Sequence, residues 1–161
     1  RNLPSWIGID RALGAFGAFN RAKNYGIEST GLLIADAGTI LSLTRLKATG
    51  EFAGGQLVAG LSLQLWAMEH GTQNLTNPGL DNFTQEKFPS STSGAMQRGA
   101  LQALIGTLLE ANHAANTTLW LCGGDGPILF KELRKYDLNI FHYPNLVLEG
   151  MINLNSKSSK A

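Results

Sequence analysis

Three short apolar segments separated by tight turns constrain the fold of this chain most strongly. Gly31–Ala35, Ile40–Leu46 and Phe52–Val58 each have the length of one strand, and the second alternates apolar with polar residues. The connections Asp36–Thr39 and Ala48–Glu51 are too short for a crossover between parallel strands. The sequence therefore predicts an antiparallel meander of three strands.

The segments around the meander alternate between helical and strand patterns. Helical spacing predicts helices that begin at Asp10, near Gly60 and at Thr92, and helices over Ile128–Tyr136 and Leu146–Ile152, while Thr117–Leu121 and Leu138–His142 read as strands. Asp10 and Thr92 are candidate N-caps. A meander followed by αβα crossovers predicts an α/β fold, a ribonuclease-H-like mixed sheet with flanking helices. We expect one domain over residues 1–152 and a flexible tail over 153–161.

Composition excludes several classes of function. Thirteen Lys and Arg against twelve Asp and Glu give a net charge of +1, which argues against a large nucleic-acid surface. No apolar run approaches the ~18 residues of a membrane span, so no membrane partner is expected. Cys122 is the single cysteine, lies in an apolar run and is expected to be a buried thiol, which fits a reducing, cytoplasmic compartment. Trp66, Trp120 and Phe130 are expected in the core.

The segment Gly8-Ile9-Asp10-Arg11 places an acid beside a base at a helix start. Backbone amides there attract anions, and the guanidinium is a forked donor suited to carboxylate or phosphate. Asp10 is therefore a candidate acceptor of a proton from a hydroxyl group. A helix cap with a surface arginine is the alternative interpretation.

The turn Asp36-Ala37-Gly38-Thr39 follows a predicted buried strand. Gly38 permits close approach of a ligand to the backbone, Asp36 can hold a cation, and the Thr39 hydroxyl can meet a phosphate. An ordinary β-turn explains the same pattern. Gly123-Gly124-Asp125, between a strand and a helix, is open to the same two interpretations.

Other catalytic patterns are missing from the sequence. The three histidines do not cluster, and no HxxxH or CxxC spacing indicates a zinc site. Neither the GxxxxGK[ST] loop nor the GxSxG elbow occurs.

Taken together, six motifs in order resemble the type III pantothenate kinases, also called the Bvg accessory factor family. The first two are the acidic segments just described, which match the family patterns GxDR and DxGT. The remaining four are Gly50–Gly60 for G-x-F-x-G-G-x-I-x-P-G, Thr92–Gly99 for T-x-x-A-x-x-x-G, Leu121–Asp125 for L-T-G-G-D, and Pro144–Met151 for P-N-L-V-L-x-G-L. Ala59 stands where the family usually has proline, and Cys122 where it has threonine.

The resemblance implies a fold and an activity. The family belongs to the acetate/sugar kinase, chaperone ATPase and actin superfamily, and its members use ATP to phosphorylate the 4′-hydroxyl of pantothenate, the first step of coenzyme A synthesis. They use Mg²⁺ and a monovalent cation, K⁺ or ammonium. They are homodimers whose pantothenate site is closed by the partner subunit.

The resemblance also implies roles for individual residues. Asp10 would be the general base, and Gly8, Ile9, Asp10 and Arg11 would hold pantothenate together with Thr92. Asp36 would bind the monovalent cation. Gly38 and Thr39 would contact ATP.

Two family features have no counterpart in this chain. The D-x-G-N-T phosphate loop of the N-terminal domain does not occur in the 161 residues, so the chain resembles the C-terminal part of the family. We expect such a fragment to phosphorylate pantothenate very poorly by itself. An acid usual after the DxGT strand core is replaced, with Ser42 and Thr44 in that region.

Two other functions remain open from the sequence. A non-catalytic homologue that acts as a binding or accessory regulatory protein would tolerate the missing loop. Another kinase or phosphatase of the superfamily would explain DxGT, although not GxDR or the segment that begins at Thr92.

Overall fold

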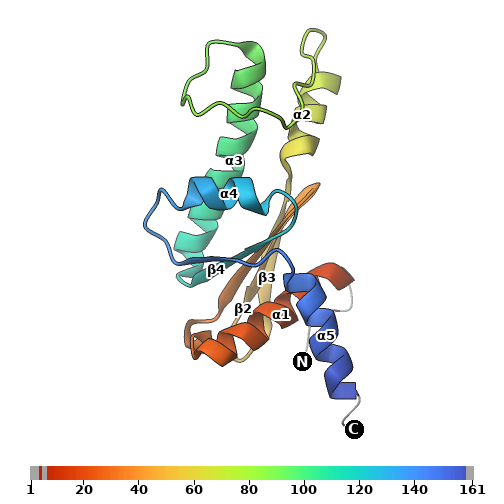
Figure 1. Ribbon diagram of the computed structural model, residues 1–161, viewed down its shortest axis with the longest axis vertical. Helices are drawn as coiled ribbons and strands as arrows, with labels where there is room; N and C mark the ends of the chain where they lie inside the picture. Colours follow the sequence, from red (N-terminus) through yellow and green to blue (C-terminus); the bar gives the residue numbers. More distant parts are fainter. Residues whose placement is uncertain (1–3, 5–6, 159–161) are drawn as a thin grey trace.

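The computed structural model describes residue 4 and residues 7–158 (Figure 1). The elements in chain order are α1 (Ile9–Tyr25), η1 (Glu28–Thr30), β1 (Leu32–Ala37), β2 (Ile40–Leu46), β3 (Phe52–Ala59), α2 (Leu61–His70), α3 (Thr92–Ala115), β4 (Thr118–Cys122), α4 (Gly126–Leu133), β5 (Ile140–His142) and α5 (Leu146–Ser158). Every strand and helix predicted from the sequence is therefore present, and all except β2 have at least one shifted end.

The strands form one mixed sheet in the order β3-β2-β1-β4-β5. The pairs β1–β2 and β2–β3 are antiparallel, which confirms the predicted meander, and β4 and β5 join it in parallel. The turn before β3 closes on Gly50, whose φ of 83° lies in the left-handed region that glycine tolerates. The register of β2 on β3 shifts between Thr44 and Leu46. The predicted α/β fold class is confirmed.

Helices cover both faces of the sheet. One face carries the larger core, in which α2, α3 and α4 pack on leucines and alanines of β1, β2 and β4. The other face carries α1 and α5 over a second core centred on Trp120, which is fully buried. Beyond the sheet, α2 and the first half of α3 project together, and the segment 71–91 lies at their tip (Figure 1).

The α1 and α5 helices approach each other through glycines. A Cβ on Gly17 would collide with the Leu146 carbonyl oxygen, and a Cβ on Gly150 would collide with the backbone of Leu13. Arg21 of α1 forms an ion pair with Glu149 of α5 beside this contact. The glycines of α1, which cost helix propensity, are therefore explained by interhelical packing.

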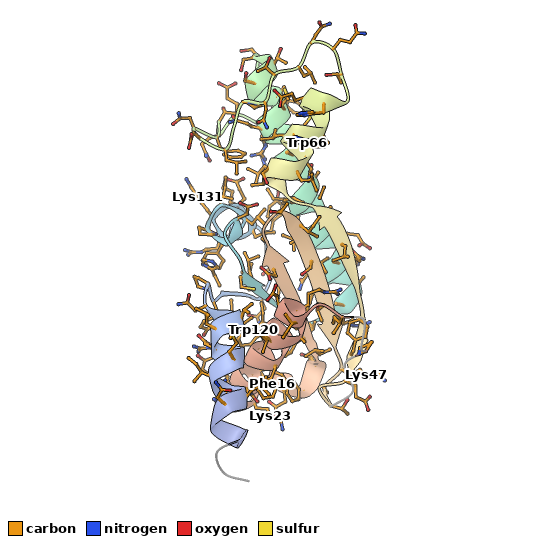
Figure 2. The ribbon with its side chains drawn as sticks, turned by 90° about the vertical axis from the view of Figure 1, so that its right-hand side faces the viewer. Phe16, Lys23, Lys47, Trp66, Trp120 and Lys131 are labelled. Carbon is orange, nitrogen blue, oxygen red and sulfur yellow. The ribbon has the colours of Figure 1, made fainter. Side chains whose placement is uncertain are left out.

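The structure corrects three sequence predictions. The N-cap of α1 is Gly8 and that of α3 is Ser91, so Asp10 and Thr92 lie inside the first turns. Trp66 is 50% exposed and stacks on His70, because it lies on the projecting part of α2 (Figure 2). Trp120 and Cys122 are buried as predicted.

The C-terminal helix is also longer than predicted. The flexible tail was expected to begin at residue 153, but α5 continues from Leu146 to Ser158. Asn and Ser in this stretch are weak helix formers, yet none breaks a helix as Pro or Gly would. Residues 159–161 of the predicted tail lie outside the described residues.

We expect Gly17→Ala to lower the free energy of unfolding by about 1–3 kcal/mol, because the new methyl group is forced against a backbone carbonyl. Gly106→Ala in α3 is the matched control, since a Cβ added at this position would meet nothing within 4 Å. That change should raise the free energy of unfolding by about 0.5–1 kcal/mol through helix propensity. Urea denaturation measures both values, and equal effects would contradict the packing argument.

Candidate active site

Three turns meet at the carboxyl ends of β1 and β4. Asp36 and Cys122 are partners in the parallel register of these strands. The Asp125 amide donates to the Ala37 carbonyl oxygen at 2.9 Å, and the Gly60 amide donates to the Thr39 carbonyl oxygen at 2.8 Å. The turns after β1, β3 and β4 are thus fixed to one another at the edge where open α/β sheets bind ligands.

Two glycines make this convergence possible. A Cβ on Gly60 would collide with the Gly38 carbonyl oxygen. Gly123 has a φ of 88°, and a Cβ there would lie 2.6 Å from the Ala37 amide nitrogen and against the Asp36 carboxyl group. The glycine at position 123 therefore allows two backbones to approach closely. This agrees with the interpretation of the Gly-Gly pair after β4 as an ordinary turn.

Asp36 sits in an environment that opposes its negative charge. Its partial burial raises the pKa of the carboxyl group, the charge of Asp10 raises it further, and a hydrogen bond from the Cys122 thiol acts in the opposite direction. Burial and the adjacent Asp36 raise the pKa of the thiol to about 12. The two acids singled out from the sequence therefore lie within electrostatic reach of each other.

The first turn of α1 presents Asp10 and Arg11 differently. The Asp10 side chain is exposed. The Arg11 side chain lies across the sheet, where its Nε donates to Thr44 Oγ1 at 3.2 Å and its Nη2 donates to the Leu43 carbonyl oxygen at 3.0 Å. Partial burial lowers the pKa of the guanidinium. Arg11 thus fixes the start of α1 over β2, and Asp10 faces solvent beside it.

The Asp125 side chain contacts the start of α2. Its carboxyl group accepts a hydrogen bond from the Leu61 backbone amide. Burial raises the pKa of this carboxyl group, and the hydrogen bond opposes part of that increase. Leu61 begins α2, whose N-cap Gly60 offers no side-chain oxygen. Asp125 therefore satisfies one of the free amides at that helix start.

Thr92 is not brought to the other site residues. It lies in the first turn of α3, at the projecting end of the α2–α3 pair, whereas α1 lies over the sheet in the other half of the molecule (Figure 1). Asp10 begins α1 with Gly8, Ile9 and Arg11, and its charge reaches Asp36 in the turn that also holds Gly38 and Thr39. Thr92 is on neither of these segments.

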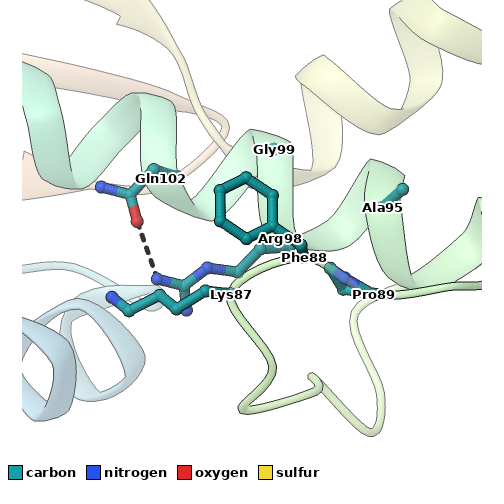
Figure 3. A pocket seen from close by; sticks show the side chains of 7 residues that line it. All are labelled: Lys87, Phe88, Pro89, Ala95, Arg98, Gly99 and Gln102. Atoms are coloured by element: carbon teal, nitrogen blue, oxygen red, sulfur yellow. Dashed lines mark hydrogen bonds between the residues drawn. The ribbon is translucent and has the colours of Figure 1, made fainter.

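A separate hollow of about 480 Å³ lies close to Thr92 rather than to Asp10. Its lining is Lys87, Phe88, Pro89, Ala95, Arg98, Gly99 and Gln102 (Figure 3). Arg98 is 5% exposed and is paired with the buried Glu132 of α4, and its Nη2 donates to Gln102 at 2.7 Å. The guanidinium on the wall of this hollow is therefore already satisfied by the protein.

Oxygen atoms surround the turn that follows β1. The Asp36 carboxyl group and the backbone carbonyl groups of the neighbouring turns are hard donors, the type that hard cations bind. Over residue 4 and residues 7–158, no group of three or more His, Cys, Asp or Glu side chains is arranged to hold a metal ion. A magnesium ion in kinases is bound through one or two carboxylates together with substrate phosphates, which is compatible with this arrangement.

The family model described as type III pantothenate kinase matches residues 2–113. This range contains the Asp10 and Asp36 motifs and all of α3 except its last two residues. The chain belongs to the type III pantothenate kinase family.

Curated relatives agree with this membership. Type III pantothenate kinase of Rhodopirellula baltica is 30% identical over 95% of this chain and 56% of its own length. Its counterpart from Synechococcus sp. strain JA-3-3Ab is 32% identical over 90% of this chain and 60% of its own length. The chain thus spans between half and two thirds of the length of these relatives.

Solved structures share the fold. The crystal structure of a Baf family protein from Campylobacter jejuni superposes with a TM-score of 0.69 and 21% identity, covering 99% of this chain and 69% of that chain. The Alp12 filament structure gives a TM-score of 0.63 and 12% identity, covering 91% of this chain and 53% of that chain. At these identities the likeness concerns the fold alone.

No helix in the described part of the chain combines the length and the hydropathy that crossing a membrane demands.

Sequence reasoning missed two contacts of this site. Thr44 was noted only as a replacement for an acid, and the structure makes it the acceptor for Arg11. The bond between Asp125 and the start of α2 carried no sequence signal, because the two segments are over sixty residues apart and meet only through the sheet.

We expect Asp36→Asn to raise the free energy of unfolding at pH 7. The pKa of the Asp36 carboxyl group is higher in the folded chain than the ordinary value of 3.8, so its ionisation favours the unfolded state. The gain should shrink as the pH falls through the folded pKa toward 3.8, because the native carboxyl group then becomes protonated. Urea denaturation between pH 4 and pH 7 checks this, with Asp81→Asn in the exposed loop as control. A gain independent of pH would contradict the electrostatic explanation.

Proposed function

We propose that the protein contributes to the ATP-dependent phosphorylation of pantothenate to 4′-phosphopantothenate, the first step of coenzyme A biosynthesis. One observation carries the proposal for a chain of this family: Asp10 and Asp36 come from separate motifs, and they lie close enough that the charge of Asp10 raises the pKa of Asp36. Two like charges held together favour a site that receives a cation or a proton.

Asp10 serves as the general base. Its exposed carboxylate stands in the first turn of α1, where it can accept the proton of the 4′-hydroxyl as that oxygen attacks the terminal phosphate of ATP. Gly8, Ile9 and Arg11 form the surface on which pantothenate is held. Partial burial and two hydrogen bonds hold the Arg11 guanidinium in place, so it positions a polar group of the substrate at little entropic cost.

The turn after β1 serves the nucleotide. In this proposal Gly38 and Thr39 contact ATP, and Asp36 holds K⁺ or ammonium; the exposure of Thr39 supports its role. These cations, together with Mg²⁺, supply positive charge that offsets the charge of the phosphates. The protein's own contribution is to keep Asp36 fixed between β1 and β4.

We propose that the active form is a homodimer. Thr92 is the remaining residue assigned to pantothenate, and it lies at the projecting end of α3, away from Asp10 (Figure 1). A single copy cannot bring both to one pantothenate in this conformation, whereas the α2–α3 pair of a second copy can carry its Thr92 to the first. The separation of the two residues in one chain supports this proposal of a dimer.

A cytoplasmic location completes the proposal, and it rests on the single, buried cysteine, which fits a reducing compartment. No specific contact favours a purely accessory role over the kinase. The arrangement of two acids beside an arginine serves chemistry, and a passive scaffold has no need of it.

Calorimetric titration with pantothenate tests the substrate assignment without requiring turnover. We expect saturable binding by the chain, retained in Asp10→Asn and weakened about tenfold or more in Arg11→Ala, since a hydrogen bond to a charged group is lost. Where the protein turns over ATP, Asp10→Asn should abolish pantothenate-dependent turnover. Unchanged turnover in that variant would reject the base, and absence of binding in the wild type would reject the substrate.

A mixing experiment tests the shared site. Arg11→Ala and Thr92→Val should each weaken pantothenate binding when prepared alone. When the two variants are co-expressed, half of the dimers are mixed and each has one intact site, so about a quarter of the sites should regain wild-type affinity. No recovery, together with a monomeric mass in sedimentation, would contradict the dimer.

A further inference from the structure

The part of α3 that projects beyond the sheet is packed differently from the rest of this helix. Toward its C-terminal end the buried side chains are all apolar: Leu101, Leu104, Ile105, Leu108, Ala111 and Ala115. The projecting part also buries two polar side chains, Gln97 and Arg98. Gln97 Nε2 donates to the carbonyl oxygens of Gly79 and Asp81 at 3.1 and 2.9 Å. Directional polar contacts therefore appear where the helix leaves the sheet.

Arg98 joins this part of α3 to α4 through an ion pair that is nearly closed to solvent. Its Nη1 lies 3.4 Å from Glu132 Oε2, and the two side chains are 5% and 4% exposed. Glu132 also accepts a hydrogen bond from Lys135 Nζ at 2.6 Å. Burial raises the pKa of the Glu132 carboxyl group, but the hydrogen bonds and charges of Lys135 and Arg98 outweigh this effect and lower the pKa overall. The Glu132 carboxyl group is therefore ionised at neutral pH.

The α4 end of this ion pair is fixed to the sheet. Leu129 and Leu133 of α4 are fully buried in the larger core, together with Leu119 and Leu121 of β4. Glu132 directly precedes one of these leucines, so its position follows that of the sheet. Arg98 thus links the projecting part of α3 to a group that the body of the molecule holds in place.

A buried ion pair specifies the relative position of two helices more strictly than apolar packing does. Apolar cores accept several arrangements at similar free energy, whereas a buried charge is stable only while it meets its partner. A rotation of the projecting part of α3 away from α4 would separate Arg98 from Glu132 where little water can replace either partner. The ion pair therefore resists such a rotation.

We propose that Arg98 and Glu132 are positioning residues whose ion pair fixes the direction in which the α2–α3 pair projects from the sheet, and thereby the place to which Thr92 is carried. The inference rests on the proposed function, in which Thr92 of one copy meets pantothenate at the other copy. Thr92 lies nearly two helical turns before Arg98, so it follows the direction of α3 at that point. Both residues act through the helix and not through contact with the substrate.

Paramagnetic labels measure this direction without a ligand. One label is placed at Ser93 in α3 and the other at Lys131 in α4, which are both exposed, while Cys122 is too buried to react. An excess of unlabelled chain restricts the measurement to distances within one copy. Pulsed EPR should give a narrow distance distribution in the wild type and one at least about twice as wide in Arg98→Met/Glu132→Leu. An unchanged width would overturn the proposal.

The double variant removes the ion pair without leaving a buried charge. Methionine and leucine are apolar and of similar size, and the groups that lose a contact, Gln102 and Lys135, are exposed and can be hydrated. Its urea midpoint should equal or exceed that of the wild type, so a wider distribution reports position and not stability. If the double variant does not fold, Arg98→Met alone is measured, since Glu132 then keeps Lys135 as its partner. A wild-type width in that variant would overturn the proposal.

Two controls restrict the expected effect to the projecting part of α3. The distance between labels at Lys23 of α1 and Lys131 of α4 should stay unchanged in the double variant, because both helices pack on the sheet. Arg21→Met/Glu149→Leu removes the ion pair between α1 and α5 and should leave the distribution between α3 and α4 as narrow as in the wild type. Widening in either control would overturn the specific role of the buried pair.

Pantothenate binding tests the consequence for the substrate. In calorimetry the double variant should bind pantothenate about tenfold more weakly than the wild type, because Thr92 is no longer held in one place before binding. Wild-type affinity together with a widened distance distribution would overturn the link to the substrate. If the wild type does not bind pantothenate, the proposed function fails, and the distance distributions alone decide the role of the ion pair.

Discussion

The parallel pairing of β1 with β4 is the constraint on which the rest of the structure depends. It places the ends of two strands that are more than eighty residues apart in the sequence at one edge of the sheet, with Asp36 opposite Cys122. The turns that follow are then tied together by backbone hydrogen bonds through Ala37 and Thr39. The placement of Asp36 beside the Cys122 thiol is a consequence of this pairing and of no local motif.

The second requirement is that α1 lies at a fixed angle over the same sheet. Glycine contacts and an ion pair with α5 hold its middle, and Arg11 anchors its first turn to β2. Packing at one end of the helix therefore determines where Asp10 stands at the other. Stability and site geometry are linked here, because the glycines that weaken the isolated helix allow the approach that positions its acid.

Much of the fold could be predicted from the sequence, because strand length, turn length and helical spacing are local signals. Ile40–Leu46 was predicted to the residue, and the mixed sheet followed from short and long connections. Helix ends were less accurate, because neighbouring residues can serve as caps. Ser91 rather than Thr92 caps α3 through a hydrogen bond from the Gly94 amide, and Gly8 precedes α1 without a side-chain cap. The separation of Thr92 from Asp10 could not be predicted, since it depends on how far α2 and α3 project beyond the sheet.

The single thiol has a further consequence for how the molecule can be observed. Cys122 is 1% exposed, ends β4 beside the Asp36 carboxyl group and belongs to the core that α1 and α5 cover. An alkylating reagent can reach it only when this core opens, so the labelling rate under native conditions gives the free energy of that opening. The chain thus contains its own reporter of local unfolding, and the event that it reports is the opening of the helical layer that carries Asp10.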